Sequence, residues 1–200
     1  MGVSERKQRQ HEELRNQIIE CSREIVEEEG WANLSIRKIA DAIEYSVPVI
    51  YKHFENKEAI TAYFVQEGFQ NLLNEVLAHI DSNASIEDRF QQLGMGYYHF
   101  AEKFPKHYEV MFGLGIPTCE SARNVESINQ LSGIFRSMIK ELSHKNPNKE
   151  IDQCLKYRTL WSLLHGVVAF ELLALPGVNP VCSTKALEDV VDGYVKSILF

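Results

Sequence analysis

Apolar residues recur at helical spacing along most of the chain, and no segment shows the alternation expected of a β-strand. Within each segment they lie three or four positions apart, which places them on one side of a helix that packs on a shared core. Gly, Pro, Asn and Ser mark the breaks between segments. Predicted helices cover about 10–29, 57–79, 85–103, 107–112, 121–144, 149–175 and 184–199, and two short helices lie within 35–54. The pattern predicts an all-α fold of about nine helices.

The stretch over residues 34–57 predicts two short helices joined by a three-residue turn. Ser35 and Ser46 stand where N-caps are expected, each with an apolar residue before it and another at the fourth helical position. Pro48 falls in the first turn of the second helix, where its missing N–H breaks no helical hydrogen bond. Because only residues 44–46 remain to turn the chain, the stretch predicts a helix-turn-helix motif.

The second of these helices has one side for packing and one side that can face DNA. At about 100° per residue, its inner residues are Val47, Ile50 and Phe54, its outer residues are Pro48, Val49, Lys52 and His53, and Tyr51 lies at the border. The major groove of DNA is wide enough to admit such a helix. Short capped helix pairs are also common, so the spacing alone leaves a solvated basic corner as the alternative.

Residues 10–60 resemble the N-terminal domain of the TetR family of bacterial transcriptional regulators. That family shows a hydroxyl residue, an Ile-Ala pair, a turn, and then Tyr-x-His-Phe followed by Lys. This chain has Ser35, Ile39-Ala40, Ser46, Tyr51-Lys52-His53-Phe54 and Lys57 in that spacing. The family turn is usually Ala-Gly-Val, whereas this chain has Ile43-Glu44-Tyr45. Glu44 must therefore adopt the left-handed backbone that suits Gly, or the chain must turn differently.

The resemblance implies a set of DNA-binding residues: Arg37, Val47, Pro48, Val49, Tyr51, Lys52, His53 and Lys57. By family position, Arg37 reaches a base edge or a nearby phosphate, and a guanine suits a bidentate Arg. The residues at 51, 53 and 57 match phosphate-contacting positions, which set register. Pro48 and Val49 could touch thymine methyl groups. Val47 matches a base-reading position, although its place on the helix turns it inward.

The net charge of −7 means that DNA binding must rely on local positive charge. The candidates are Arg6, Lys7, Arg9, Arg37, Lys38, Lys52 and Lys57. The charged N-terminus lacks the apolar core of a signal peptide, and no apolar run is long enough to span a membrane. We therefore expect a cytoplasmic protein.

Motifs for catalysis and for metal binding are missing from the sequence. It contains no GxSxG, HExxH, P-loop or GxGxxG pattern, so we expect neither an enzyme nor a cofactor. The four cysteines, at positions 21, 119, 154 and 182, are widely spaced and form no CxxC pair, so no metal site is expected. Whether any of them senses redox state stays open.

The segment over residues 160–175, LWSLLHGVVAFELLAL, is apolar nearly all round. A helix without a polar face must be covered on both sides. A second copy of the chain can cover it, through a symmetric contact of the last two helices of each subunit, and Gly166 would permit close approach. A dimer also suits a palindromic DNA site. The alternative is a central helix in a monomeric bundle.

The C-terminal half extends the resemblance, because Trp161, His165 and Gly166 match a Trp-x-x-x-His-Gly pattern of one TetR subgroup. We therefore expect a DNA-binding domain over 1–56 and a ligand-binding, dimerisation domain over 57–200. The candidate ligand-binding residues are Tyr97, Phe100, Phe104, Met111, Phe112, Phe135, Trp161, His165 and Glu171. An apolar pocket with few polar anchors is a usual small-molecule site, although each of these residues could simply be core.

The function implied is a repressor released from a palindromic operator by a small, partly apolar ligand. An activator or a ligand-independent regulator fits the same residues. A helical protein-interaction adaptor would need the bundle but not Arg37, Tyr51, Lys52 and Lys57 together. The expected partners are therefore double-stranded DNA, an effector and a second copy of the chain.

Overall fold

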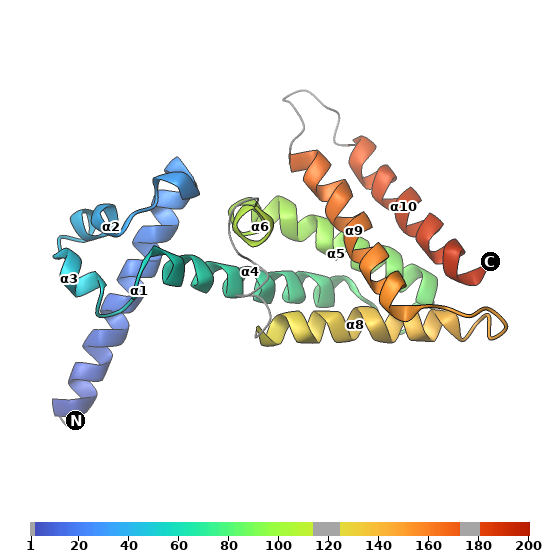
Figure 1. Ribbon diagram of the computed structural model, residues 1–200, viewed down its shortest axis with the longest axis horizontal. Helices are drawn as coiled ribbons and strands as arrows, with labels where there is room; N and C mark the ends of the chain where they lie inside the picture. The colour runs from blue at the N-terminus through green and yellow to red at the C-terminus, as the bar shows by residue number, and fades with distance from the viewer. Residues whose placement is uncertain (1–2, 114–124, 173–180) are drawn as a thin grey trace.

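The computed structural model describes residues 3–113, 125–172 and 181–200, and the side chains of 5–113, 125–170 and 184–200 (Figure 1). These residues form nine α-helices and one 3-10 helix, with no strand among them, so the predicted all-α fold is confirmed. The elements are α1 (Val3–Glu29), a 3-10 helix (Trp31–Asn33), α2 (Ile36–Ala42), α3 (Val47–Ile50), α4 (Lys57–His79), α5 (Ile86–Lys103), α6 (Pro105–Phe112), α8 (Glu126–Ser143), α9 (Gln153–Leu172) and α10 (Val181–Leu199).

The molecule is elongated, with α1, α2 and α3 at one end and a helical bundle at the other (Figure 1). Helix α4 leaves the first group and runs into the second, where it packs on α5, α6 and α8. Helices α9 and α10 lie side by side on one flank of the bundle. One long helix therefore connects the two ends of the molecule.

Side-chain caps begin α2, α4 and α5 as predicted. The Ser35 side chain accepts a hydrogen bond from the Lys38 N–H, and the Asn56 side chain accepts one from the Ala59 N–H. Ser85 caps α5 in the same way. Each cap satisfies an N–H group that has no partner inside the helix. These local bonds explain why the predicted starts of the three helices agree with the structure.

The prediction of a side-chain cap at Ser46 is wrong. Ser46 occupies the N-cap position of α3, but its hydroxyl makes no capping hydrogen bond. A cap needs an N–H at the second or third helical position. Pro48 fills the second and has no N–H, and the Val49 N–H donates to the Ser46 carbonyl oxygen at 2.8 Å instead. The proline that favours the helix start thus removes one of the donors for the serine.

Helix boundaries without a strong signal differ from the prediction. Helix α1 begins at Val3, because the polar residues before Gln10 continue the helix without Pro or Gly to stop it. Helix α9 begins at Gln153, and Asp152 accepts a hydrogen bond from the Leu155 N–H at 3.0 Å. The predicted helix ends at 121 and 175 lie outside the described residues.

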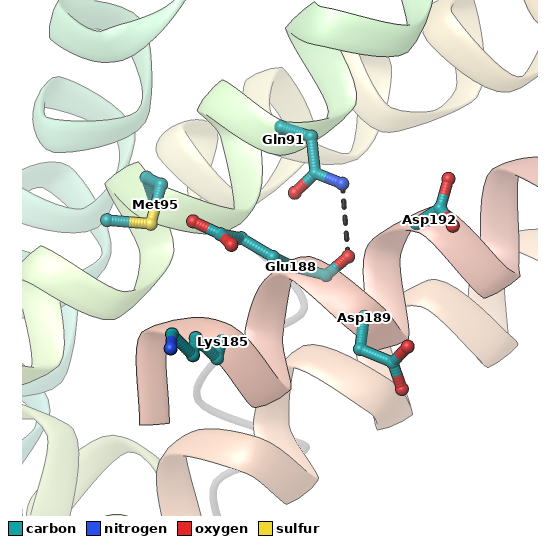
Figure 2. Close-up of a pocket in the computed structure, with 6 residues that line it drawn as sticks. All are labelled: Gln91, Met95, Lys185, Glu188, Asp189 and Asp192. Carbon is teal, nitrogen blue, oxygen red and sulfur yellow. Dashed lines mark hydrogen bonds between the residues drawn. The ribbon is translucent and has the colours of Figure 1, made fainter. Parts of the chain in front are cut away.

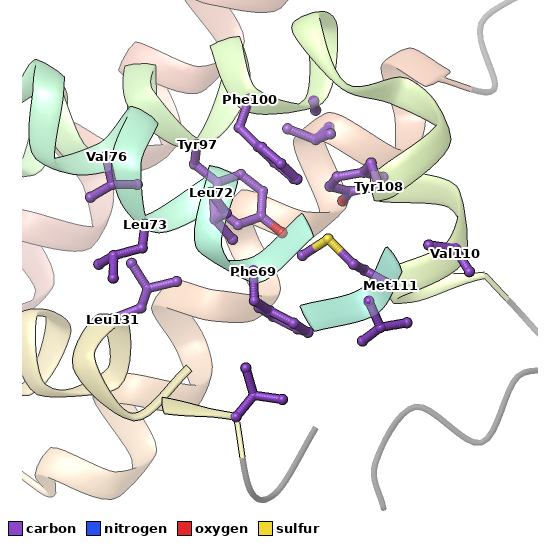
Figure 3. Packing of buried hydrophobic residues seen from close by; sticks show 14 of the residues in the cluster. Phe69, Leu72, Leu73, Val76, Tyr97, Phe100, Tyr108, Val110, Met111 and Leu131 are labelled. Atoms are coloured by element: carbon purple, nitrogen blue, oxygen red, sulfur yellow. The ribbon is translucent and has the colours of Figure 1, made fainter. Parts of the chain in front are cut away.

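The core of the bundle is built around α4, whose buried residues point at α5, α6 and α8 (Figure 3). Phe69, Leu72 and Val76 are each at most 4% exposed. A side chain at Gly96 of α5 would meet the Val76 backbone at 2.8 Å, so this glycine allows α4 and α5 to approach closely. Tight packing along α4 makes it a rigid link rather than a loose tether.

A groove of about 520 Å³ lies between α5 and α10 (Figure 2). It is lined by Gln91, Met95, Lys185, Glu188, Asp189 and Asp192. The Gln91 amide donates to the Glu188 carbonyl oxygen at 3.1 Å, which joins the two helices across the groove. Most of its lining side chains are exposed and charged, and none was predicted to bind ligand.

Candidate functional site

The helix-turn-helix consists of α2, a turn over residues 43–46 and the short helix α3. Glu44 has a φ of 58°, so it adopts the left-handed backbone that the missing glycine would favour. The Tyr45 N–H donates to the Ala40 carbonyl oxygen at 2.9 Å and closes the turn. Of the two alternatives for this turn, the family-like geometry is the one observed.

The inner side of α3 packs as its helical period predicts. Ile50 is fully buried and Phe54 is 4% exposed, and both belong to a core shared with α1, α2 and α4. Val47 is half-buried and packs against the same core. Its inward orientation is confirmed, so its side chain offers little surface for reading a base.

The outer side exposes two basic side chains together with an aromatic and an apolar residue. Arg37 from α2 and Pro48, Tyr51 and Lys52 from the α3 region are exposed, and Tyr51 is 51% exposed. Val49 is half-buried. No hydrogen bond or ion pair between described residues holds the Arg37 or Lys52 side chain, so both cations can reach a ligand. The arrangement suits a surface that docks on a polyanion.

His53 lies in a strongly cationic setting. Its ring packs at a tilt of 33° against the ring of His11 of α1, with centroids 4.1 Å apart. Burial, together with His11, Arg15 and Lys52, lowers the pKa of His53. Its Nδ1 is buried and has no hydrogen-bond partner among the described residues. The ring therefore fixes α3 to α1 in its neutral form, a structural role beside any phosphate contact.

Two of the predicted basic candidates are held by partners within the chain. The Lys57 ammonium donates to the Trp31 carbonyl oxygen at 3.1 Å, and Lys38 forms an ion pair with Glu29. Lys57 is half-buried as a result. Its bond also ties the start of α4 to the 3-10 helix, so this lysine stabilises the domain as well as adding positive charge near the outer face.

Aromatic side chains from four helices of the bundle meet in one cluster. Trp161 of α9 packs edge-on against Tyr97 of α5 and Phe135 of α8, with centroids 5.7 and 5.3 Å apart. Phe112 of α6 contacts both Trp161 and His165, at 6.3 and 4.9 Å. The structure thus brings together five of the nine predicted ligand-binding residues in one aromatic cluster.

Three of the other four predicted ligand-binding residues lie at the border of this cluster, and the side chain of the fourth is outside the described residues. Phe100 and Phe104 pack on each other at 5.7 Å, and Met111 is buried where α6 meets Gly68 of α4. The Glu171 side chain lies outside the described residues. His99 of α5 is exposed and lies beside His79 and Glu102.

Tyr108 belongs to the cluster but was not predicted. Its hydroxyl lies 2.5 Å from His165 Nδ1, and the two rings are stacked with centroids 5.6 Å apart. Burial lowers the pKa of His165, which favours the neutral ring, and one proton is shared between its Nδ1 and the tyrosine hydroxyl. Burial also raises the pKa of Tyr108, which keeps the hydroxyl protonated. The signal in the sequence was an aromatic residue at helical spacing from Phe104 and Met111.

An ion-pair network joins the two ends of the molecule. Glu67 of α4 accepts hydrogen bonds from both guanidinium nitrogens of Arg23 of α1, at 2.8 and 3.0 Å. It also lies 2.7 Å from Nε2 of His107 on α6. The His107 hydrogen bond, followed by Arg23, lowers the pKa of Glu67 to about 2. Nearby, the Trp31 indole N–H donates to the Lys106 carbonyl oxygen at 2.8 Å.

Family models match both halves of the chain. The model for bacterial regulatory proteins of the tetR family matches residues 18–64, and that for the tetracyclin repressor-like C-terminal domain matches residues 90–194. The chain belongs to the TetR family. It is therefore a DNA-binding transcriptional regulator, and the helix-turn-helix at residues 35–54 lies within the matched N-terminal region.

Solved structures of other proteins share the fold of this TetR-family chain at low sequence identity. The fatty acid degradation regulator FadR from Bacillus halodurans is 18% identical with a TM-score of 0.68, and the match covers 88% of this chain and 93% of that one. The TetR-family regulator PfmR from Thermus thermophilus is 17% identical with a TM-score of 0.62, covering 91% and 96%. A protein of unknown function from Rhodococcus sp. RHA1 is 18% identical with a TM-score of 0.73, covering 92% and 94%. No curated protein sequence matches significantly.

Two of the four cysteines have side chains within the described residues. Cys21 is buried and Cys154 is exposed, whereas the side chains of Cys119 and Cys182 lie outside the described residues. Burial raises the pKa of Cys21, which leaves its thiol unreactive. Among the described residues, no group of three metal-binding side chains occurs, and no helix is long and apolar enough to cross a membrane.

Proposed function

We propose that this TetR-family regulator is a repressor that leaves a palindromic operator when a small, partly apolar molecule binds its C-terminal bundle. The observation that carries the proposal is the continuity of α4. This helix begins beneath the exposed basic face and packs on α5, α6 and α8, three of the four helices that form the aromatic cluster. A displacement of those helices is therefore transmitted to the DNA-binding end. We place the division between the two domains at the start of α4, as 1–56 and 57–200.

Contacts with DNA divide between reading and positioning. Arg37 is placed to reach a base edge, while Tyr51, Lys52 and Lys57 bind phosphates. Pro48 and the exposed part of Val49 contact thymine methyl groups. Val47 and His53 support these contacts mainly from within the domain. Because few polar groups read bases, DNA shape supplies part of the specificity.

Two copies of the chain bind the operator together. The outer surface of α9 carries Leu163 and Val167, both half-buried, and Phe170, which is 75% exposed. An apolar helix face of this kind is stabilised by a symmetric partner. Two recognition helices can then read two half-sites, which doubles the number of phosphate contacts made by a chain with a net charge of −7.

Selecting bound DNA from a random pool tests the operator prediction. We expect an inverted repeat, and Arg37→Ala should weaken binding to it by about 1–3 kcal/mol and relax one position of each half-site. Lys52→Ala should instead weaken selected and random DNA alike. Lys140→Ala is the matched control, because Lys140 is exposed on α8 of the bundle. If Arg37→Ala lowered affinity for all sequences equally, Arg37 would bind phosphate and not a base.

A further inference from the structure

Tyr97 buries a hydroxyl group that nothing in the described structure satisfies. The side chain is fully buried, and its Oη has no hydrogen-bond partner among the described residues. Figure 3 shows this hydroxyl directed toward the α6 side of the core, where Tyr108 and Met111 lie. Burying a polar group without a partner destabilises a protein, so such groups are rare. Phenylalanine would fill the same space without burying an unpaired hydroxyl. The hydroxyl oxygen of Tyr97 is therefore a candidate for contact with a bound molecule.

The hydroxyl can act as a donor to a bound molecule. Burial raises the pKa of Tyr97 well above its ordinary value, so the group stays protonated. The neighbouring Tyr108 hydroxyl adds to this rise in pKa through its charge and a side-chain interaction. That interaction does not reach the distance and angle of a normal hydrogen bond, so Tyr97 Oη remains without a partner among the described residues. The Tyr108 hydroxyl already has a partner, because it lies 2.5 Å from His165 Nδ1. The Tyr97 O–H is a buried donor without a partner among the described residues, and its natural partner is an acceptor oxygen.

The surroundings of Tyr97 favour a flat apolar molecule. Its ring meets Trp161 and Tyr108 edge-on, and Trp161 in turn meets Phe112. Aromatic faces and edges in this arrangement bind another planar ring well. Phe112, Trp161 and His165 are half-buried whereas Tyr97 and Tyr108 are buried, so the cluster has an accessible edge and a closed interior.

The same surroundings disfavour a charged molecule. Only burial and the neighbouring tyrosine shift the pKa of Tyr97, and burial alone lowers that of His165. No charged side chain contributes to either shift in pKa, and no ion pair between described residues involves Tyr97, Tyr108 or His165. An ion placed beside these groups would lose its hydration without gaining a counter-charge.

We propose that the effector is a planar, uncharged aromatic compound whose carbonyl or similar acceptor oxygen binds the Tyr97 hydroxyl. This inference rests on the proposed ligand-release function and adds the chemical class of the ligand and its anchor. The oxygen lies deepest, beside Tyr97 and Tyr108, and the ring system lies against the half-buried edge of the cluster formed by Trp161 and Phe112.

Calorimetric titration of the full-length protein with matched probes tests the proposal. Coumarin has two fused rings and a lactone carbonyl, and naphthalene has the same shape without an acceptor. We expect coumarin to bind about tenfold more tightly than naphthalene, the usual effect of one neutral hydrogen bond. The anion 2-naphthoate and the cation N-methylquinolinium should bind more weakly than coumarin. Tighter binding of either ion would overturn the proposal.

Tyr97→Phe removes only the oxygen. It should lower coumarin affinity about tenfold and leave naphthalene affinity unchanged, so that the preference disappears. Tyr98→Phe is the control, because Tyr98 is the next residue on α5, is 5% exposed and packs on His99 instead. A preference for coumarin that survives in Tyr97→Phe contradicts the proposed anchor.

The outcome is separable from that of the proposed function. Operator affinity measured without any probe tests DNA binding alone. If coumarin and naphthalene bind equally and both release operator, the ligand class is wrong and the release function stands. If no probe binds up to millimolar concentration, the aromatic class is wrong, while operator binding is unaffected.

Discussion

Two residues in this protein carry features that cost stability, and each lies in a region to which we assign a function. Glu44 adopts a left-handed backbone at the turn before α3. Tyr97 buries a hydroxyl without a partner at the centre of the aromatic cluster. Strain of this kind persists only where the surroundings impose it, and it concentrates at functional sites. The left-handed backbone at Glu44 was predictable, because the family turn usually has Gly at this position. The buried hydroxyl of Tyr97 was not, because its neighbours in the sequence are those of an ordinary core tyrosine.

Glu44→Gly should stabilise the DNA-binding end. A non-glycine residue in the left-handed region destabilises the folded state by about 1–2 kcal/mol, and glycine removes this strain. Glycine also loses more backbone entropy on folding, which offsets part of the gain. We therefore expect a gain of about 0.5–1 kcal/mol in the free energy of unfolding, measured with urea. Glu44→Val should lose about as much or more, because a β-branched residue tolerates a positive φ least. Equal stability of the two variants would mean that the turn rearranges.

At the scale of helices, contacts distant in sequence connect the DNA-binding end to the bundle. Arg23, Glu67 and His107 bring α1, α4 and α6 together around one carboxylate. The neighbouring residue Tyr108 points to another side of α6, and its hydroxyl lies 2.5 Å from His165 Nδ1. Helix α6 therefore contacts the interdomain network with one residue and the aromatic cluster with the next. A ligand that displaces Tyr108 acts directly on the helix that holds His107.

Stability should fall with pH through the protonation of Glu67. The folded state lowers the pKa of this carboxyl from 4.5 to about 2, so the unfolded chain takes up the proton first as pH falls. The contribution of Glu67 is complete above about pH 5 and is lost progressively down to about pH 2. Glu67→Gln should cost about 2 kcal/mol at neutral pH, because charge-assisted hydrogen bonds are lost. In the Glu67→Gln variant, the free energy of unfolding measured with urea should also fall less steeply between about pH 5 and about pH 2 than in the unaltered protein.

Glu87→Gln provides the comparison for that experiment. Glu87 pairs with Lys145, but the two side chains are 36% and 47% exposed. Exposed pairs of this kind contribute about 0.2–1 kcal/mol. If both glutamine variants lost the same stability, the Arg23–Glu67–His107 network would be an ordinary surface ion pair and not an interdomain link.

Helix boundaries with local signals were predictable, and long-range polar contacts were not. Asn56 and Pro105 act within one turn of the chain, so the start of α4 and the end of α5 follow from sequence alone. The hydrogen bond between Tyr108 and His165 joins residues 57 apart, and that between Arg23 and Glu67 joins residues 44 apart. Helical period places such side chains on an inner face but does not say which helices meet there. Lys57 shows the same limit, since its bond to Trp31 depends on tertiary structure.

At the scale of the whole molecule, an outer flank of α9 and α10 remains to be covered. Gly166 of α9 and Gly193 of α10 are exposed, and a Cβ built on either one meets nothing within 4 Å. Leu163, Val167 and Phe170 surround the first with apolar surface. Small residues beside apolar ones let two helices approach closely, which is what a symmetric four-helix contact needs.

Gly166→Glu should separate the subunits without damaging the protomer. The new side chain enters open space in the isolated chain, and replacing a helical glycine stabilises a helix by roughly 0.5–1 kcal/mol. In the dimer the same side chain would place a charge within the apolar contact. We expect the unaltered protein to sediment as a dimer at micromolar concentration and Gly166→Glu as a monomer.

Gly133→Glu makes that experiment specific. Gly133 is also a helical glycine with nothing within 4 Å of a built Cβ, but it belongs to α8 and not to either of the two helices of the proposed contact. This variant should remain dimeric. Because a dimer binds both half-sites in one event, Gly166→Glu should lose far more affinity for the full operator than for a single half-site. A dimeric Gly166→Glu, or an unaltered protein that sediments as a monomer, would place the interface elsewhere and leave the apolar flank of α9 without its proposed partner.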